Sequence, residues 1–238
     1  MGLKRLIPRP IRELKYLVRR SRSALGLVQN DGTDRYLNAV GGVLHVGANT
    51  GQERHLYHRN GVRVLWVEPI PEVFEQLARN LQEFPRQQAL RYLLTDKDGT
   101  TYDFHIANNG GASSSILDLK EHVDIWPEVG FERSIKLTGR TLDSIVTAHR
   151  IDLRNYPALV MDTQGSELLV LKGATIALQN FRYIKTEVSD FEVYSGCCTL
   201  HDLSRFLSHH GFREAVRQPF AAHPKGGQCY DVLFERVR

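Results

Sequence analysis

Short apolar segments alternate with amphipathic segments along most of the chain, and this alternation restricts the fold more than any other feature. Six apolar runs have the length expected of buried strands, at 43–46, 62–67, 89–94, 158–161, 183–188 and 230–234. Helical spacing fills the gaps at 51–60, 71–84, 141–149, 166–179 and 199–211, and 102–107 is an additional candidate strand. Strands that alternate with helices form a mostly parallel sheet with helices on both faces. We therefore predict a doubly wound α/β fold.

Positive charge is concentrated at the start of the chain. The 238 residues carry a formal net charge of +4, but residues 1–22 carry +7, so the remaining 216 carry −3. We predict a basic helical extension over 1–40, with its helix at 11–25, and a globular domain over 41–238. A solvated helix is favoured over peripheral membrane contact through 11–25. Because the body is acidic and the tail lacks interleaved aromatic residues, nucleic acid is not expected as a partner.

Cysteine and histidine usage indicates a cytoplasmic protein without a metal centre. Cys197, Cys198 and Cys229 are an odd number of cysteines, two of them adjacent, so reduced thiols are expected rather than a disulfide framework. Neither these residues nor the ten histidines show the spacing of a metal-ligand set. The sequence also lacks the apolar core of a secretory signal and any apolar run of about 18 residues that would span a membrane.

A glycine-containing loop, HVGANTG at 45–51, follows the first predicted strand. Gly47 and Gly51 allow a tight turn in which the backbone approaches a ligand closely. Glu68 ends the next predicted strand, where an acid accepts hydrogen bonds from both ribose hydroxyls of a nucleoside. The loop has the spacing G-x-x-x-G and lacks the middle glycine of dinucleotide-binding loops. The missing glycine favours a nucleoside ligand without a pyrophosphate. The loop and Glu68 together favour ligand binding over the alternative that the glycines serve only packing.

Asp96 closes the third predicted strand and begins the turn DKDG at 96–99. Ligands of open parallel sheets bind beyond the carboxyl ends of the strands, so this position suits an acid that binds the amino group of adenine. A purely turn-forming aspartate is the alternative. With Glu68 already placed, we favour the adenine role.

A second motif, ALVMDTQGSELLVLKGA at 158–174, combines a strand that ends at Asp162, a turn at Gly165 and a helix with Glu167 in its first turn. Other distinctive pieces are VLHVGANTGQE at 43–53, VEPIPEVFEQLARN at 67–80 and IKTEVS at 184–189. With these pieces the chain resembles FkbM-family methyltransferases, which are class I S-adenosylmethionine-dependent enzymes. The resemblance covers residues 40 to 215, and its most specific part is D-x-x-G-x-E-x-x-V-L-K-G-A.

The resemblance implies a seven-stranded Rossmann-like methyltransferase sheet and methyl transfer from S-adenosylmethionine to a hydroxyl of a sugar, glycan or natural product. By position it assigns the cofactor to seven residues: His45, Gly47, Asn49, Gly51, Gln52, Glu68 and Asp96. His45 stands where most members carry an acid. A neutral histidine accepts one hydrogen bond there but supplies no fixed negative charge.

An unactivated hydroxyl reacts faster when a base takes its proton. Asp162 and Glu187 end predicted strands, and we expect one of them to orient or deprotonate the acceptor. The loop at 108–115, rich in Asn, Gly and Ser, is expected to close over the cofactor or acceptor, and 116–134, with Trp126, to shape the acceptor pocket. A nicotinamide-dependent oxidoreductase acting on a sugar is the alternative function. It shares the loop and the ribose-binding acid but not the second motif.

Overall fold

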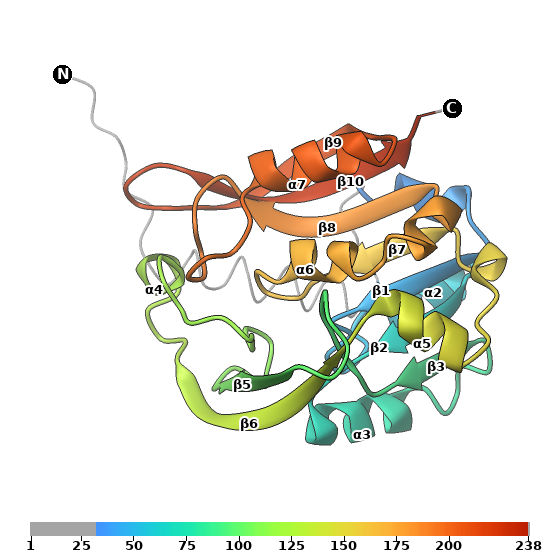
Figure 1. Cartoon of the computed structure of the whole chain (residues 1–238), viewed down its shortest axis with the longest axis horizontal. Helices are drawn as coiled ribbons and strands as arrows, with labels where there is room; N and C mark the ends of the chain where they lie inside the picture. The colour runs from blue at the N-terminus through green and yellow to red at the C-terminus, as the bar shows by residue number, and fades with distance from the viewer. Residues whose placement is uncertain (1–31, 238) are drawn as a thin grey trace.

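The computed structural model describes residues 32–237, and their centre is a seven-stranded sheet (Figure 1). Its order is β3-β2-β1-β7-β8-β10-β9. The strands are β1 (Gly42–Val46), β2 (Arg63–Val67), β3 (Gln87–Leu90), β7 (Ala158–Met161), β8 (Tyr183–Ser189), β9 (Phe212–Ala222) and β10 (Gln228–Arg236). The first five in spatial order run parallel, and β10 is antiparallel to both neighbours. The predicted doubly wound, mostly parallel α/β sheet is confirmed.

Successive residues of β1 face opposite sides of the sheet, and each side is covered by helices. Leu44 packs with apolar residues of α5 (Leu142–Ala148), α6 (Glu167–Lys172) and α7 (Leu200–His209). Val43 packs on the other side with residues of α2 (Arg54–Arg59), α3 (Pro71–Asn80) and the short 3-10 helix η1 (Arg35–Asn38). All five residues of β1 are buried. This two-sided burial is the reason that the strand is continuously apolar apart from His45.

Helix caps that the sequence predicts are present. The Thr141 hydroxyl accepts from the Ser144 backbone N–H at the start of α5. Thr199 and Asp202 form a reciprocal capping box at the start of α7. The helix predicted over 166–179 is shorter than expected, because α6 ends at Lys172 and a separate 3-10 helix, η3 (Ala177–Asn180), follows. Gly173 follows α6 at a position where a Cβ would overlap the carbonyl oxygen of Thr95.

The single third strand predicted over 89–94 is wrong, because the chain divides between two sheets. Gln87–Leu90 joins the large sheet as β3, whereas β4 (Leu93–Leu94) pairs with β6 (Phe131–Arg140) in a second sheet of order β4-β6-β5. The predicted strand at 102–107 is confirmed as β5 (Thr101–Ala107). Apolar content alone does not tell which sheet a short run joins. The small sheet and the single-turn helix α4 (His122–Ile125) lie on the side of the large sheet where the carboxyl end of β8 is found, at the left of Figure 1.

β9 and β6 were not predicted, and both have many exposed residues. β9 is an edge strand that contains Pro219, which is tolerated at an edge because it has no N–H to donate. A further 3-10 helix, η2 (Leu153–Asn155), precedes β7. The predicted helix at 11–25 lies outside the described residues. Within 32–237, no helix is long and apolar enough to cross a membrane.

Candidate functional site

Backbone contacts hold the loop after β1 against the chain that follows β7. The N–H groups of Gly47 and Ala48 donate to the carbonyl of Val67 at 3.0 and 3.1 Å, and the N–H of Asp162 donates to that of Val46 at 3.0 Å. Gly47 has φ +78°, and a Cβ at this position would overlap the carbonyl oxygen of Asp162. Only glycine fits, since any side chain would meet backbone that other hydrogen bonds fix. The predicted tight turn at Gly47 is therefore present, whereas the approach of its backbone to a ligand stays a prediction.

Glu68 follows β2 and is buried beside this loop. Its Oε2 accepts from the backbone N–H of Asn49 at 2.8 Å, and its Oε1 accepts from that of Ile70 at 3.0 Å. Burial raises the pKa of Glu68 to about 7, although the two backbone hydrogen bonds oppose the shift; the charge of Asp162 raises it further. A carboxylate has about four lone-pair positions, so each oxygen retains capacity for a ligand hydroxyl.

Asn49 organises the same loop through its side-chain amide. It has φ +45°, a conformation that asparagine tolerates better than most residues. Its Oδ1 accepts from the Thr50 N–H at 2.8 Å and from Gln52 Nε2 at 3.0 Å, and its Nδ2 donates to the carbonyl of Gly110 at 3.2 Å. The segment 108–115 therefore lies against the glycine loop. Its closure over a ligand remains a prediction.

His45 lies inside β1 and is used within the core. Its Nδ1 is 3.0 Å from the hydroxyl of Tyr57, and its ring stacks on Trp66 with centroids 4.6 Å apart. Burial, with a smaller contribution from Lys185, lowers the pKa of His45 to about 3, so the imidazole is neutral. The cofactor-binding role predicted for His45 therefore has no support in the structure, because its ring is committed to packing between β1, β2 and α2.

Asp96 does not lie at the carboxyl end of a strand of the large sheet, because it follows β4 in the small sheet. Asp96 therefore lacks the position at the end of a large-sheet strand that its adenine role requires, and that role stays a prediction. The other acid of the turn, Asp98, has the structural role: it accepts from the Thr141 N–H at 2.9 Å and from Ser144 Oγ at 2.7 Å. These hydrogen bonds, the one from Ser144 first, lower the pKa of Asp98 to about 2.

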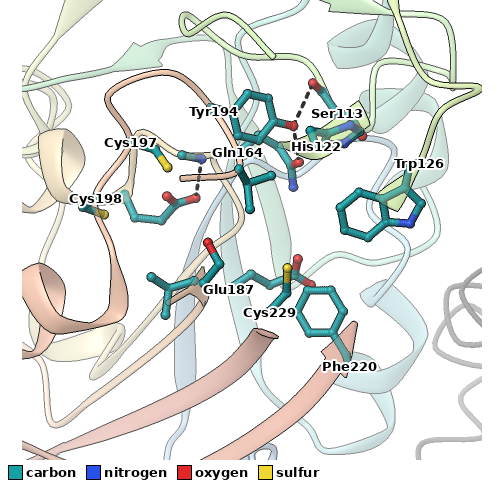
Figure 2. Close-up of a pocket in the computed structure, with 15 residues that line it drawn as sticks. Ser113, His122, Trp126, Gln164, Glu187, Tyr194, Cys197, Cys198, Phe220 and Cys229 are labelled. Atoms are coloured by element: carbon teal, nitrogen blue, oxygen red, sulfur yellow. Dashed lines mark hydrogen bonds between the residues drawn. The ribbon is translucent and has the colours of Figure 1, made fainter. Parts of the chain in front are cut away.

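Hydrogen bonds connect Asp162, through Gln164 and Tyr194, to the segment 108–115; Figure 2 shows Gln164, Tyr194 and Ser113. Gln164 donates from Nε2 to Asp162 Oδ1. The hydroxyl of Tyr194 lies 2.7 Å from Gln164 Oε1 and 3.1 Å from the carbonyl oxygen of Ser113. Gln164 has φ +54°, so this turn holds a strained residue in a fixed orientation. The carboxylate of Asp162 is thus part of a positioned network at the end of β7.

Glu167, in the first turn of α6, closes the same turn. Its Oε1 accepts from the Thr163 N–H at 2.9 Å and the Gly165 N–H at 3.3 Å. Burial raises the pKa of Glu167 to about 7. The hydroxyl Oγ1 of Thr163 is buried and has no hydrogen-bond partner among residues 32–237. A buried hydroxyl without a partner is costly, so a ligand that pairs with it would be stabilised here.

A pocket that is partly open to solvent lies beyond the carboxyl ends of β7 and β8 (Figure 2). Glu187 and Trp126, both candidates for the acceptor site, line it, whereas Asp162 is not among the lining residues. That the acceptor binds in this pocket stays a prediction. Ser113 and His122 also line the pocket, and they belong to the segments 108–115 and 116–134 expected near the cofactor and acceptor. Side chains that were not among the candidates line it too: Gln164, Tyr194, the three cysteines and Phe220. Gln164 lies inside the second motif, where its position after a strand was a usable signal. His122 and Phe220 come from segments without a clear pattern.

The cysteines are reduced thiols, and all three line this pocket. Burial raises the pKa of Cys198 and of Cys229 to about 12, so both are protonated and unreactive at neutral pH. Within the part of the chain that the structure describes, no group of three or more His, Cys, Asp or Glu side chains is placed to hold a metal ion.

Solved methyltransferases are similar to this chain at low sequence identity. One is the magnesium protoporphyrin IX methyltransferase of Synechocystis PCC 6803 with bound S-adenosylmethionine, at 10% identity and a TM-score of 0.49, covering 100% of this chain and 86% of that one. Another is the 1,6-didemethyltoxoflavin-N1-methyltransferase of Burkholderia thailandensis, at 12% identity and a TM-score of 0.44, covering 100% and 94%.

Sequence comparison gives the family. The 2-O-methyltransferase NoeI of Sinorhizobium fredii is 30% identical over 162 residues, which span 65% of this chain and 65% of that protein. The model of the methyltransferase FkbM domain matches residues 45–214, from the strand before the glycine loop into β9. That range includes the glycine loop, Glu68, the Asp162 network and Glu187. The chain therefore belongs to the FkbM methyltransferase family.

Proposed function

We propose that this protein is an S-adenosylmethionine-dependent O-methyltransferase that acts on a hydroxyl of a sugar, glycan or natural product. The observation that carries the proposal is the arrangement of Glu68. It is a buried carboxylate hydrogen-bonded to the N–H of Asn49, next to the close contact of Gly47 with Asp162. Membership of the FkbM family and the 2-O-methyltransferase relative support oxygen as the acceptor atom.

The residues at the end of β1 and β2 suit the cofactor chemically. Glu68 would accept from the ribose hydroxyls, while Gly47, Asn49, Gly51 and Gln52 would border the methionine and ribose side. The unpaired hydroxyl of Thr163, on the neighbouring loop, would donate to an anionic or carbonyl group of the ligand. When bound, S-adenosylmethionine supplies an electrophilic methyl group on a positively charged sulfur.

The protein's own contribution is to orient the acceptor hydroxyl and receive its proton. Glu187 lies at the end of β8 and lines the pocket next to the Asp162 network, so we assign proton acceptance to its carboxylate. Asp162 acts as a positioning residue, because its carboxylate holds the side chain of Gln164. Bringing the hydroxyl oxygen to about 3 Å from the methyl carbon, in line with the bond that breaks, provides most of the remaining acceleration.

Incubation with methyl-labelled S-adenosylmethionine and a panel of glycosides and hydroxylated natural products tests the proposal. Mass spectrometry is expected to find a product that is heavier by one labelled methyl group attached through oxygen. S-Adenosylhomocysteine should form in equal amount. If neither product forms with any hydroxylated acceptor, the proposal is contradicted.

Replacing Glu187 with glutamine is expected to lower kcat about 100-fold, because an amide does not accept the hydroxyl proton. The Kd for S-adenosylhomocysteine should stay within about twofold, since Glu187 lies in the acceptor pocket. Glu128→Gln is the control, because Glu128 is exposed and does not line the pocket. Equal turnover in the Glu187 variant and the control would remove the assigned role.

Cofactor affinity is expected to fall as the pH is lowered through about 7. Ribose hydroxyls donate to the charged form of Glu68, so binding lowers a pKa that is about 7 in the free protein. The affinity is then highest above pH 7, where Glu68 is ionised. Below pH 7 the affinity decreases by up to about tenfold per pH unit. Titration calorimetry with S-adenosylhomocysteine from pH 5.5 to 8.5 measures this dependence. A Kd that does not change with pH would be inconsistent with ribose binding by Glu68.

A further inference from the structure

His122 belongs to the single-turn helix α4 and lines the pocket together with two aromatic rings. Its ring centroid lies 4.7 Å from that of Trp126 and 5.4 Å from that of Tyr194. Figure 2 shows these three side chains on the upper and right side of the pocket, with Glu187 and Phe220 on the lower side. The backbone of α4 is fixed by the bond from the His122 N–H to the carbonyl of Val193 at 3.1 Å. The backbone of this turn is therefore fixed, and the ring packs between the two aromatic neighbours.

The imidazole of His122 is buried, and one of its two nitrogens has no hydrogen-bond partner among the described residues. Its Nδ1 finds no hydrogen-bond partner among residues 32–237, and only 2% of the residue is exposed. Burial lowers the pKa of His122 to about 4, so the ring is neutral and one of its nitrogens is an acceptor. An unsatisfied buried polar atom is rare and destabilises the empty protein. A phenylalanine would fill this position without that cost, so a ligand hydroxyl is the partner that explains a histidine.

The charges around the pocket indicate which ligands it admits. Glu167 and Glu187 are the acidic side chains in its lining, and no lysine or arginine lines it among the described residues. Among the residues that the structure describes, an anionic acceptor, such as a sugar phosphate, would meet two carboxyl groups and no compensating cation. The rings of Trp126, Tyr194 and Phe220 instead offer apolar faces to the C–H face of an uncharged ring.

From these observations we propose that the pocket is a subsite for an uncharged polyhydroxylated ring, in which His122 accepts a hydrogen bond from a ring hydroxyl while Trp126 and Tyr194 contact the ring faces. The inference rests on the proposed function, since it concerns the acceptor of the same reaction. His122 determines specificity and binding, whereas Glu187 receives the proton. The two residues are therefore separable by their effects on KM and kcat.

Steady-state kinetics with neutral methyl glycosides of the common hexoses and deoxyhexoses test the subsite. His122→Phe is expected to raise KM about tenfold, because it keeps the ring shape but removes the acceptor atom. His122→Asn should restore most of the affinity, because its side-chain oxygen accepts a hydrogen bond at the position of Nδ1. His201→Phe is the control, since His201 is exposed on α7. The 6-phosphates of the same glycosides should be at least tenfold poorer substrates.

Two readouts do not depend on turnover. The Kd for S-adenosylhomocysteine should be equal in the wild type and in His122→Phe. The thermal midpoint of His122→Phe should equal or exceed that of the wild type, because the variant removes an unpaired buried nitrogen; a structural histidine would give a lower midpoint.

The outcomes separate this inference from the proposed function. A wild-type protein that does not bind S-adenosylhomocysteine contradicts the proposed function itself. Cofactor binding without methylation of any neutral glycoside overturns the subsite. So does an unchanged KM in His122→Phe, or phosphorylated glycosides that react as well as the neutral ones.

Discussion

Replacing Gly47 with alanine is expected to lower the free energy of unfolding by roughly 4 kcal/mol. The new Cβ would overlap the carbonyl oxygen of Asp162, and the residue would have to keep φ +78°. Neither loop can move easily, since Gly47 and Asp162 donate to Val67 and Val46, respectively. The substitution therefore separates the two loops on which the proposed cofactor site depends.

Gly61→Ala is the matched control for this prediction. Gly61 also has a positive φ, +66°, but a Cβ there would meet nothing within 4 Å. Its expected cost is only about 1 kcal/mol, from the backbone conformation alone. Urea unfolding followed by tryptophan fluorescence measures both values, and Trp66 is a buried reporter in the large sheet. Similar losses in the two variants would show that the contact between Gly47 and Asp162 is not tight.

Replacing Glu68 with glutamine is expected to raise the Kd for S-adenosylhomocysteine at least 100-fold. Two hydrogen bonds from ribose hydroxyls to a buried carboxylate each contribute about 1.5–3 kcal/mol. In the wild type, the backbone N–H groups of Asn49 and Ile70 each donate to one oxygen of Glu68. In the variant, the NH₂ of the glutamine would face one of these two donors and could not accept from it. Calorimetry at pH 8, where Glu68 is mostly ionised in the wild type, gives the largest difference.

Glu72→Gln controls for the loss of one acid from the same segment. Glu72 lies in the first turn of α3, and its exposed carboxylate accepts from Arg133 at 2.8 Å. Exposed ion pairs contribute little to stability, so the Glu72→Gln variant should remain folded. The Kd of this variant for S-adenosylhomocysteine should stay within about twofold of the wild-type value. If Glu68→Gln binds the ligand as tightly as Glu72→Gln does, Glu68 does not hold the ribose.

Features that depend on local periodicity were predictable from the sequence. The parallel strands at 43–46 and 158–161, the caps at Thr141 and Thr199 and the tight turn at Gly47 all follow from residue patterns within a few positions. The position of Glu68 at the end of β2 follows from the same reasoning, because the strand before it is continuously apolar. Each of these features is decided by neighbours in the chain.

Features that depend on tertiary pairing were not predictable. His45 has the position of a ligand-binding residue, but Tyr57 and Trp66, from other elements, provide its contacts. Asp96 was misplaced because Leu93 and Leu94 pair with β6 rather than extend β3. His122 was expected only as part of the segment 116–134, since its aromatic neighbours and its unpaired nitrogen are defined only by the folded pocket.

Titration calorimetry of the full chain with S-adenosylhomocysteine and, separately, with NAD⁺ tests the central claim most directly. The glycine loop lacks the middle glycine that a pyrophosphate requires, and Glu68 suits the ribose of either ligand. We expect saturable binding of S-adenosylhomocysteine to the wild type and loss of this binding in the Glu68→Gln variant. With NAD⁺ we expect no heat of binding. Binding of NAD⁺ without binding of S-adenosylhomocysteine would contradict the central claim.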